Sequence, residues 1–186
     1  MFKDFVNINF SDLNFKENPV VRFSFLTLIA LVLWVLFDSL YSADIAIMKS
    51  IQYQTAWLLN TFTNTEYTTS EVTFDNGTSK FGIFCSNTGM RVGKTCNGKS
   101  IMFMYASFIL IFPNINIKRR LVYLILGLII LHEFNVLRVM LLAIILENAP
   151  DYFPTMHHYF FQVLVYIIIF FLVKKFIHVS KNSKAG

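Results

Sequence analysis

The chain has 186 residues, of which 55% are hydrophobic and only 15% are charged. This composition excludes an ordinary soluble domain and predicts a polytopic membrane protein with one compact membrane unit. The net charge of +5 does not indicate nucleic-acid binding. The basic residues lie mostly in short runs beside apolar segments, which is the pattern that orients a protein in a membrane.

The N-terminal 22 residues mix polar and aromatic side chains, and the apolar segment 23–43 follows them. That segment is long enough to cross about 30 Å of hydrocarbon. A cleaved signal peptide is the alternative interpretation, but Asp38 interrupts the apolar core and Tyr41 fits the small-residue cleavage rule poorly. We therefore interpret residues 1–22 as a cytoplasmic segment and residues 23–43 as the first membrane span.

Residues 43–62 have the periodicity of an amphipathic helix, with apolar residues recurring at helical steps and polar residues between them. The predicted apolar face consists of Ile45, Met48, Ile51, Leu58 and Phe62, and the intervening polar residues include Lys49, Gln52 and Gln54. With Trp57 as an anchor, this pattern predicts a helix lying in the membrane interface.

From about residue 61 to residue 100 the sequence is polar. It alternates around Asp75-Asn76-Gly77, and Asn-Gly favours the positive φ values of a type I′ turn. The segment therefore predicts a small loop domain with a two-stranded β-hairpin on one side of the membrane.

Three further apolar segments follow at 100–113, 121–147 and 159–173, and the first of them is short for a span. The chain is expected to cross the membrane twice between the basic run 118–120 and the basic C-terminal tail, so both lie on the same side. The basic N-terminal segment falls on that side as well. This asymmetry predicts both termini inside the cell.

The predicted fold class is an all-α polytopic membrane protein with about four transmembrane helices, one interfacial helix and one outward loop with a β-hairpin. The membrane domain extends over residues 23–177 and includes an extracytoplasmic loop of about residues 44–99. Residues 178–186 form a basic cytoplasmic tail.

Arg138 is the one lysine or arginine within the apolar segment 121–147. A charge near the bilayer centre costs roughly 2.5–3.5 kcal/mol on insertion scales, so an intramembrane arginine is by default a candidate functional residue. Counted from Leu121 at the inner edge, Arg138 lies about 25 Å across a core about 30 Å thick. We therefore expect it near the outer leaflet.

Cys96, before the second span, and His157 and His158, at the outer mouth of the last span, fall at the same depth as Arg138. A thiol attacks only as thiolate, and a nearby cation or imidazole favours that form. A histidine can also protonate a departing amine, and an arginine can hold the negative charge that develops on a carbonyl oxygen. Because the set lacks metal-ligand spacing, it predicts cofactor-free attack on an amide through a thioacyl intermediate.

Neighbouring polar residues have structural explanations. We expect Cys85 to be a structural thiol, although the oxidising outer side would allow a disulfide with Cys96. Asn135 lies three residues before Arg138 and is expected to orient its guanidinium. His132 and Glu133 are expected to satisfy one another within the bundle.

The residues "CNG" at Cys96–Gly98, "NVLR" at Asn135–Arg138 and a histidine opening a later span resemble the exosortase/archaeosortase family over about residues 90–175. The short four-span form resembles the exosortase F subgroup most. The chain departs from typical members in having fewer spans. In addition, "HHYFFQV" replaces the glycine and tryptophan often found after the family histidine.

The resemblance implies a membrane cysteine protease or transpeptidase of the cell (inner) membrane with an outward active site. Its partners would be the bilayer and the C-terminal sorting-signal helix of exported proteins, followed in the substrate by a basic tail, and the acceptor nucleophile stays open. On this resemblance Cys96 is the nucleophile, Arg138 stabilises the oxyanion or thiolate, and His157 or His158 is the acid/base. His158 is slightly preferred because it lies nearer the helix start.

Two other functions remain as alternatives. A membrane disulfide oxidoreductase would use Cys85 and Cys96, but the chain has no Cys-x-x-Cys pair, the usual redox arrangement. A non-catalytic scaffold or assembly factor would pair Arg138 with Glu133 or Glu147 and would give Cys96 no chemical role.

Overall fold

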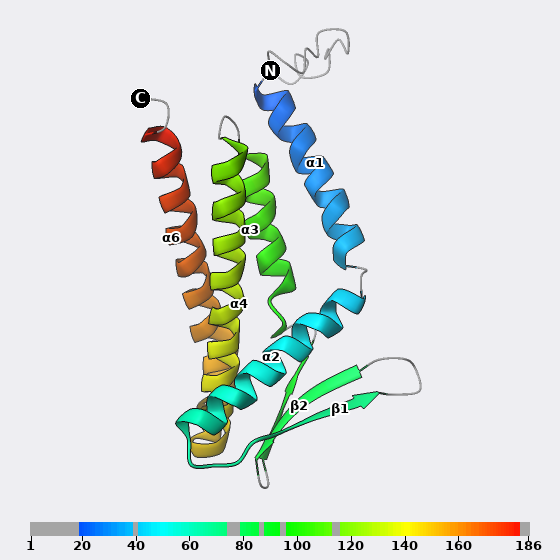
Figure 1. Ribbon diagram of the computed structural model, residues 1–186, viewed down its shortest axis with the longest axis vertical. Coiled ribbons are helices and arrows are strands. Elements are labelled where there is room, and N and C mark those ends of the chain that lie inside the picture. Colours follow the sequence, from blue (N-terminus) through cyan, green and yellow to red (C-terminus); the bar gives the residue numbers. More distant parts are fainter. Residues whose placement is uncertain are drawn as a thin grey trace, which may run out of the picture. The chain divides into compact units, whose positions relative to one another are not determined.

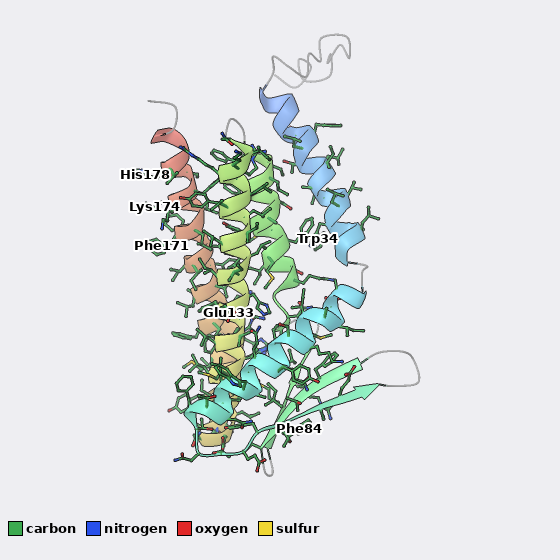
Figure 2. The ribbon with its side chains drawn as sticks, in the orientation of Figure 1. Trp34, Phe84, Glu133, Phe171, Lys174 and His178 are labelled. Atoms are coloured by element: carbon green, nitrogen blue, oxygen red, sulfur yellow. The ribbon has the colours of Figure 1, made fainter. Side chains whose placement is uncertain are left out.

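The computed structural model describes residues 19–38, 41–73, 79–85, 88–93, 96–112 and 116–182 (Figure 1). The chain divides into two compact units, Met1–Ser39 and Leu40–Gly186. The first unit contributes the apolar helix α1 (Pro19–Asp38), from which Trp34 projects (Figure 2). Most of the predicted cytoplasmic segment 1–22 lies outside the described residues.

Three helices of the second unit lie alongside one another (Figure 1). They are α3 (Lys99–Ile111), α4 (Ile117–Asn148) and α6 (Phe161–Asn182). Helix α4 contacts both of the others. A 3-10 turn η3 (Pro150–Tyr152), the short helix α5 (Phe153–Thr155) and a π-helical turn η4 (Met156–Phe160) lead from α4 into α6.

Helices α3, α4 and α6 share a small core in which Tyr105, Ile109, Leu131 and Phe176 are buried. The Tyr105 hydroxyl donates to the Tyr123 carbonyl oxygen at 2.8 Å. Its ring fills the space where a side chain at Gly127 would lie, because a Cβ there would come within 2.2 Å of Tyr105. The absence of a side chain at Gly127 therefore sets how closely α3 approaches α4.

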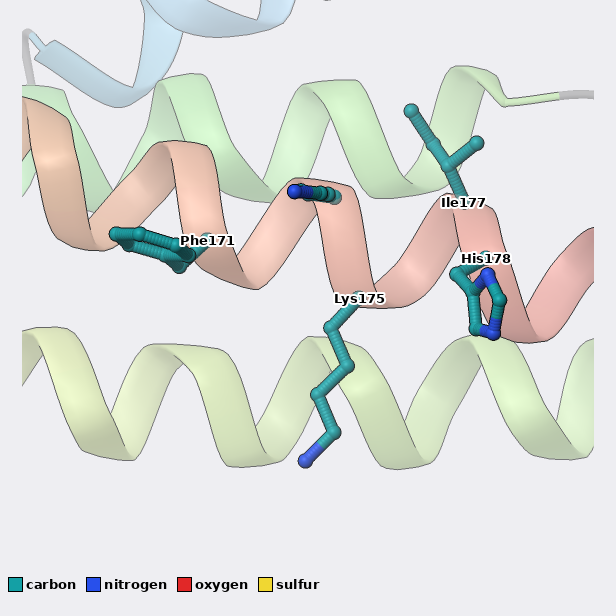
Figure 3. Close-up of a pocket in the computed structure, with 5 residues that line it drawn as sticks. Phe171, Lys175, Ile177 and His178 are labelled. Atoms are coloured by element: carbon teal, nitrogen blue, oxygen red, sulfur yellow. The ribbon is translucent and has the colours of Figure 1, made fainter.

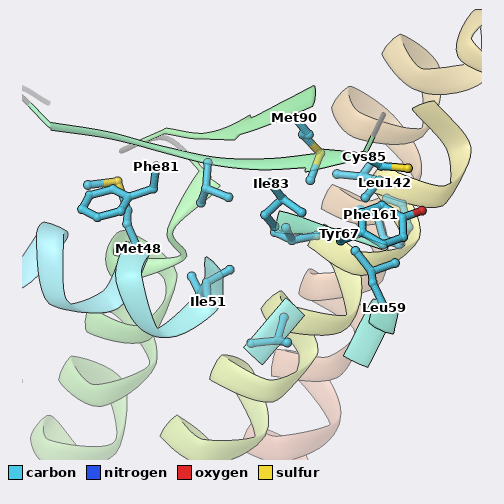
Figure 4. Packing of buried hydrophobic residues seen from close by; sticks show 14 residues of the cluster. Met48, Ile51, Leu59, Tyr67, Phe81, Ile83, Cys85, Met90, Leu142 and Phe161 are labelled. Carbon is cyan, nitrogen blue, oxygen red and sulfur yellow. The ribbon is translucent and has the colours of Figure 1, made fainter. Parts of the chain in front are cut away.

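Helix α2 (Tyr41–Phe62) crosses α4, and a three-stranded antiparallel sheet packs on it. The strands β1 (Thr68–Thr73), β2 (Ser79–Cys85) and β3 (Thr88–Val92) have the order β1-β2-β3. Side chains of α2, β2 and the C-terminal half of α4 meet in a second core (Figure 4). Its most buried members include Ile51, Leu59, Phe81 and Leu142.

The predicted hairpin is present as β1 and β2, which pair from Thr68 with Phe84 to Thr73 with Ser79. The predicted turn Asp75-Asn76-Gly77 lies outside the described residues. The third strand, β3, was not predicted. It is short, and it is stabilised by burial of Met90 and Val92 rather than by a strong local pattern.

The predicted amphipathic helix is present as α2, with Met48 and Ile51 buried as expected. Two positions differ from the prediction. Phe62 is 74% exposed, whereas Gln52, predicted on the polar face, is buried. The Gln52 Nε2 atom donates to the Ser70 and Gly82 carbonyl oxygens, each at 2.8 Å, so it ties α2 to two strands.

Two helical segments of the described residues are long and apolar enough to cross a membrane, Ile117–Asn148 and Pro150–Val179. Ser24–Leu36 and Lys99–Ile111 are apolar but shorter. On Ile117–Asn148 and Pro150–Val179, large apolar side chains such as Leu126 and Phe170 are more than half exposed. Such continuous apolar surface suits contact with lipid. The fold is thus mostly helical, with two clear span candidates and a small sheet.

Candidate active site

Cys96 and His157 meet although 61 positions separate them, with the Cys96 Sγ atom 3.2 Å from the His157 Nε2 atom. Cys96 lies just before α3, and His157 lies in the π-helical turn before α6. Both side chains are half-buried. A sulfur and an imidazole nitrogen at this separation are within hydrogen-bond reach, which is the geometry of a nucleophile and its base.

The π-helical turn fixes how the two adjacent histidines are presented. The His157 ring stacks on Phe153 with ring centroids 5.7 Å apart, and His158 lies edge-on to it at 4.7 Å. His158 is exposed. The geometry therefore favours His157 over His158 as the partner of Cys96, the reverse of the slight sequence preference. Single π-helical turns of this kind often occur at functional sites.

Arg138 lies half-buried on α4, and its guanidinium interacts electrostatically with His157. Its buried Nε atom has no hydrogen-bond partner among the described residues. Within the same residues, no ion pair joins Arg138 to Glu133, which is exposed on α4 (Figure 2), or to Glu147. The structural pairing expected of a scaffold is thus not found there.

Two predicted polar contacts differ from the structure. The Asn135 Nδ2 atom donates to the Cys96 carbonyl oxygen at 3.0 Å, so Asn135 contacts the cysteine backbone instead of the Arg138 guanidinium. His132 contacts the Ser50 hydroxyl at 3.2 Å instead of Glu133. Helix α2, which no sequence pattern placed against α4, supplies the competing partner for His132.

Three residues at this site were missed by sequence reasoning, and all three are buried. The Asp44 carboxylate accepts from Asn97 Nδ2 at 2.6 Å and pairs with Lys99 Nζ at 2.9 Å. The Asn97 Oδ1 atom accepts from the Lys99 backbone N–H at 2.9 Å. One signal was available, since Lys99 is a cation on the predicted outer flank of a span, against the usual inward bias of basic residues.

The profile of the family described as transmembrane exosortase (Exosortase_EpsH) matches residues 15–174. The chain belongs to the transmembrane exosortase family. No curated protein and no solved structure matches the chain. Membership of this family, together with the apolar helices, identifies the chain as a membrane protein with a sortase-like function in general.

The second cysteine of this exosortase has a different environment. Cys85 is buried, and its thiol donates to Glu147 Oε1 at 3.7 Å, while the Tyr67 hydroxyl donates to Oε2 of the same carboxylate. Burial raises the pKa of the Cys85 thiol, and the Glu147 carboxylate raises it further. Cys85 thus joins β2 to the end of α4 as a protonated thiol. The two cysteines are not joined by a disulfide.

We expect alkylation of Cys85 to require a more alkaline pH than alkylation of an ordinary thiol. A raised pKa leaves less thiolate at each pH, and the stabilisation from the protonated form is lost as the pH rises through that pKa. Mass spectrometry of the Cys85 peptide after iodoacetamide treatment across neutral to alkaline pH measures the profile. Glu147→Gln should move the profile toward lower pH, and rapid labelling of wild-type Cys85 at neutral pH would contradict the prediction.

The exosortase chain also has a pocket on its last helix (Figure 3). It is lined by residues of the C-terminal part of α6, namely Phe171, Lys174, Lys175, Ile177 and His178. His157 precedes the opposite end of the same helix. The pocket therefore belongs to the basic end of α6 and takes no part in the Cys96–His157 pair.

Proposed function

We propose that this chain is a membrane-embedded cysteine protease or transpeptidase that cleaves C-terminal sorting signals of exported proteins through a thioacyl intermediate. The observation that carries the proposal is the contact between Cys96 Sγ and His157 Nε2 at 3.2 Å. Family membership supports sortase-like chemistry, and the chemistry of a thiol beside an imidazole supports acyl transfer.

In the first step His157 takes the proton of the Cys96 thiol, and the sulfur attacks the scissile carbonyl carbon. A C–S bond forms, and the π electrons of the carbonyl move to its oxygen, which becomes an oxyanion. We assign the stabilisation of that charge to Arg138, whose guanidinium acts electrostatically on His157.

The oxyanion then collapses and the C–N bond breaks. His157 returns its proton to the leaving amine, which departs with the transmembrane helix and basic tail of the substrate. A thioester on Cys96 remains. A water molecule or an acceptor amine then attacks this thioester, giving its proton to His157, and the imidazolium reprotonates the departing Cys96 sulfur. Hydrolysis and transpeptidation differ only in this last nucleophile.

The basic flanks support a four-span arrangement with both termini inside the cell and the Cys96–His157 pair facing outward across the inner membrane. In this orientation the site meets exported proteins whose sorting helix still lies in the bilayer. The proposal includes the exosortase F subgroup, which a four-span arrangement resembles most. A redox function would require the two thiols to act together. Cys85 contacts Glu147 and Cys96 contacts His157, so these contacts support the protease over the oxidoreductase.

The test is co-expression with an exported reporter that ends in a short motif, an apolar helix and a basic tail taken from a protein of the same genome. We expect the reporter to lose its C-terminal segment, as measured by intact mass, and to form a hydroxylamine-sensitive adduct with Cys96. A matched reporter with a scrambled motif should stay intact. An authentic reporter that keeps its C-terminus whether or not the chain is present would refute the proposal.

A further inference from the structure

A buried ion pair lies beside the candidate nucleophile, and the mechanism above does not use it. Asp44 is fully buried, and Lys99 and Asn97 are each 2% exposed. The Asp44 carboxylate binds the Lys99 ammonium through one oxygen and the Asn97 amide through the other. These two partners lie on either side of Gly98, immediately after Cys96.

We propose that Asp44 and Asn97 are positioning residues that hold the Cys96 thiol against His157, with Lys99 neutralising the buried Asp44 carboxylate, an inference that rests on the proposed function. They act through the turn of residues 96–99, which the ion pair and the Asn97 side chain close into one hydrogen-bonded unit.

The conformation of this turn is fixed by its glycine and by contacts with α4. Gly98 has a φ of 73°, a left-handed conformation that glycine adopts without strain. A Cβ at this position would also approach the Asn135 side chain at 3.3 Å. Asn135 in turn donates to the Cys96 carbonyl oxygen. The cysteine is therefore held from α4 through Asn135 and from α2 through Asp44.

Helix α2 is itself fixed on α4 and on the sheet, which makes it a firm anchor for Asp44. Ser50 contacts His132, and the Thr55 hydroxyl donates to the Val136 carbonyl oxygen at 3.5 Å. Gln52 bonds the backbones of two strands. A movement of α2 would therefore be transmitted through Asp44 to the position of Cys96.

Stability alone does not account for such a pair. Removing two charges from water carries a desolvation penalty, and well-packed apolar residues in place of a buried ion pair are often as stable or more so. What an apolar pair cannot supply is a directed acceptor for the Asn97 amide. This difference separates a positioning role from simple neutralisation of a buried charge.

The test measures how strongly the reactivity of Cys96 depends on His157. Alkylation of the Cys96 peptide by iodoacetamide is followed by mass spectrometry in the full-length protein in membranes, with His157 present and with His157→Ala. The ratio of the two rates reports the Cys96–His157 contact even when a variant changes the exposure of the thiol. No substrate is needed, so this readout is independent of processing.

Two double variants are compared, Asp44→Asn/Lys99→Met and Asp44→Leu/Lys99→Met. Both remove the ion pair, but only the asparagine keeps an oxygen that can accept from Asn97. We expect the first to keep the wild-type ratio and the second to bring it near unity. Processing by the second should fall by about 100-fold, the cost of a misplacement of about 1 Å. Equal ratios in the two double variants would overturn the inference.

A third variant, Asn97→Ala, gives the same test if the leucine variant does not accumulate in the membrane. It leaves the ion pair in place but removes the hydrogen bond between Asn97 and Asp44, so it should also bring the ratio near unity. A wild-type ratio in Asn97→Ala would overturn the inference by itself. A ratio near unity in the wild-type protein would instead refute the proposed function, since Cys96 and His157 would then not act as a pair.

Discussion

Alanine in place of Cys96 or of His157 is expected to reduce processing of a sorting-signal substrate by about six orders of magnitude, as loss of a nucleophile or its base does in other acyl-transfer enzymes. The physical reason is the contact at 3.2 Å between the two side chains. Without the thiol no thioester forms, and without the imidazole neither the thiol nor the leaving amine exchanges its proton. The measurement is the intact mass of the reporter at matched levels of each variant in the membrane.

The chain offers a matched control for each variant. Cys85→Ala removes the other thiol, which contacts Glu147, and His158→Ala removes the neighbouring ring, which is exposed. Both should keep most of the processing. Because the pair acts as one unit, Cys96→Ala/His157→Ala should be no worse than either single variant. Equal losses in Cys85→Ala and Cys96→Ala would contradict the prediction and favour a redox function.

The sequence predicted features that depend on local pattern. The amphipathic helix now seen as α2, the β1–β2 hairpin and the long apolar α4 follow from the periodicity and turn preferences of neighbouring residues. The candidate residues Cys96, His157 and Arg138 were chosen by their expected depth in the membrane. The structure brings Cys96 to His157, and Arg138 close enough to interact with that histidine.

Contacts between distant segments were not predictable in this way. The Asp44–Lys99 ion pair joins residues 55 positions apart, and neither local segment indicates which residue is the partner. Gln52 was placed on a solvated face because periodicity describes one buried side of a helix, whereas α2 is covered by α4 on one side and by the sheet on another. Asn135 was assigned to Arg138 by helical spacing, but the Cys96 carbonyl oxygen from another segment takes its amide.

The second large effect is expected at Arg138. Arg138→Lys should insert and fold normally yet lose about 100- to 1000-fold in processing rate, the usual cost of removing one donor to a developing oxyanion. Lysine keeps the charge but not the planar fork of donors that arginine presents. In the wild-type protein the buried Nε atom of Arg138 bonds to no described residue, so this donor is not already occupied by a structural contact there. Processing is measured by intact mass at matched expression.

A structural arginine makes the opposite prediction. If Arg138 served mainly to neutralise Glu133, lysine would largely substitute for it, and Glu133→Ala/Arg138→Ala would restore what Arg138→Ala loses. No ion pair joins these two residues in the described part of the chain, and Glu133 is exposed, so we expect no rescue. Glu133→Ala alone serves as the control and should process the substrate normally. Wild-type rates in Arg138→Lys, or recovery in the double variant, would remove Arg138 from the acyl-transfer mechanism and leave the oxyanion to other donors around Cys96.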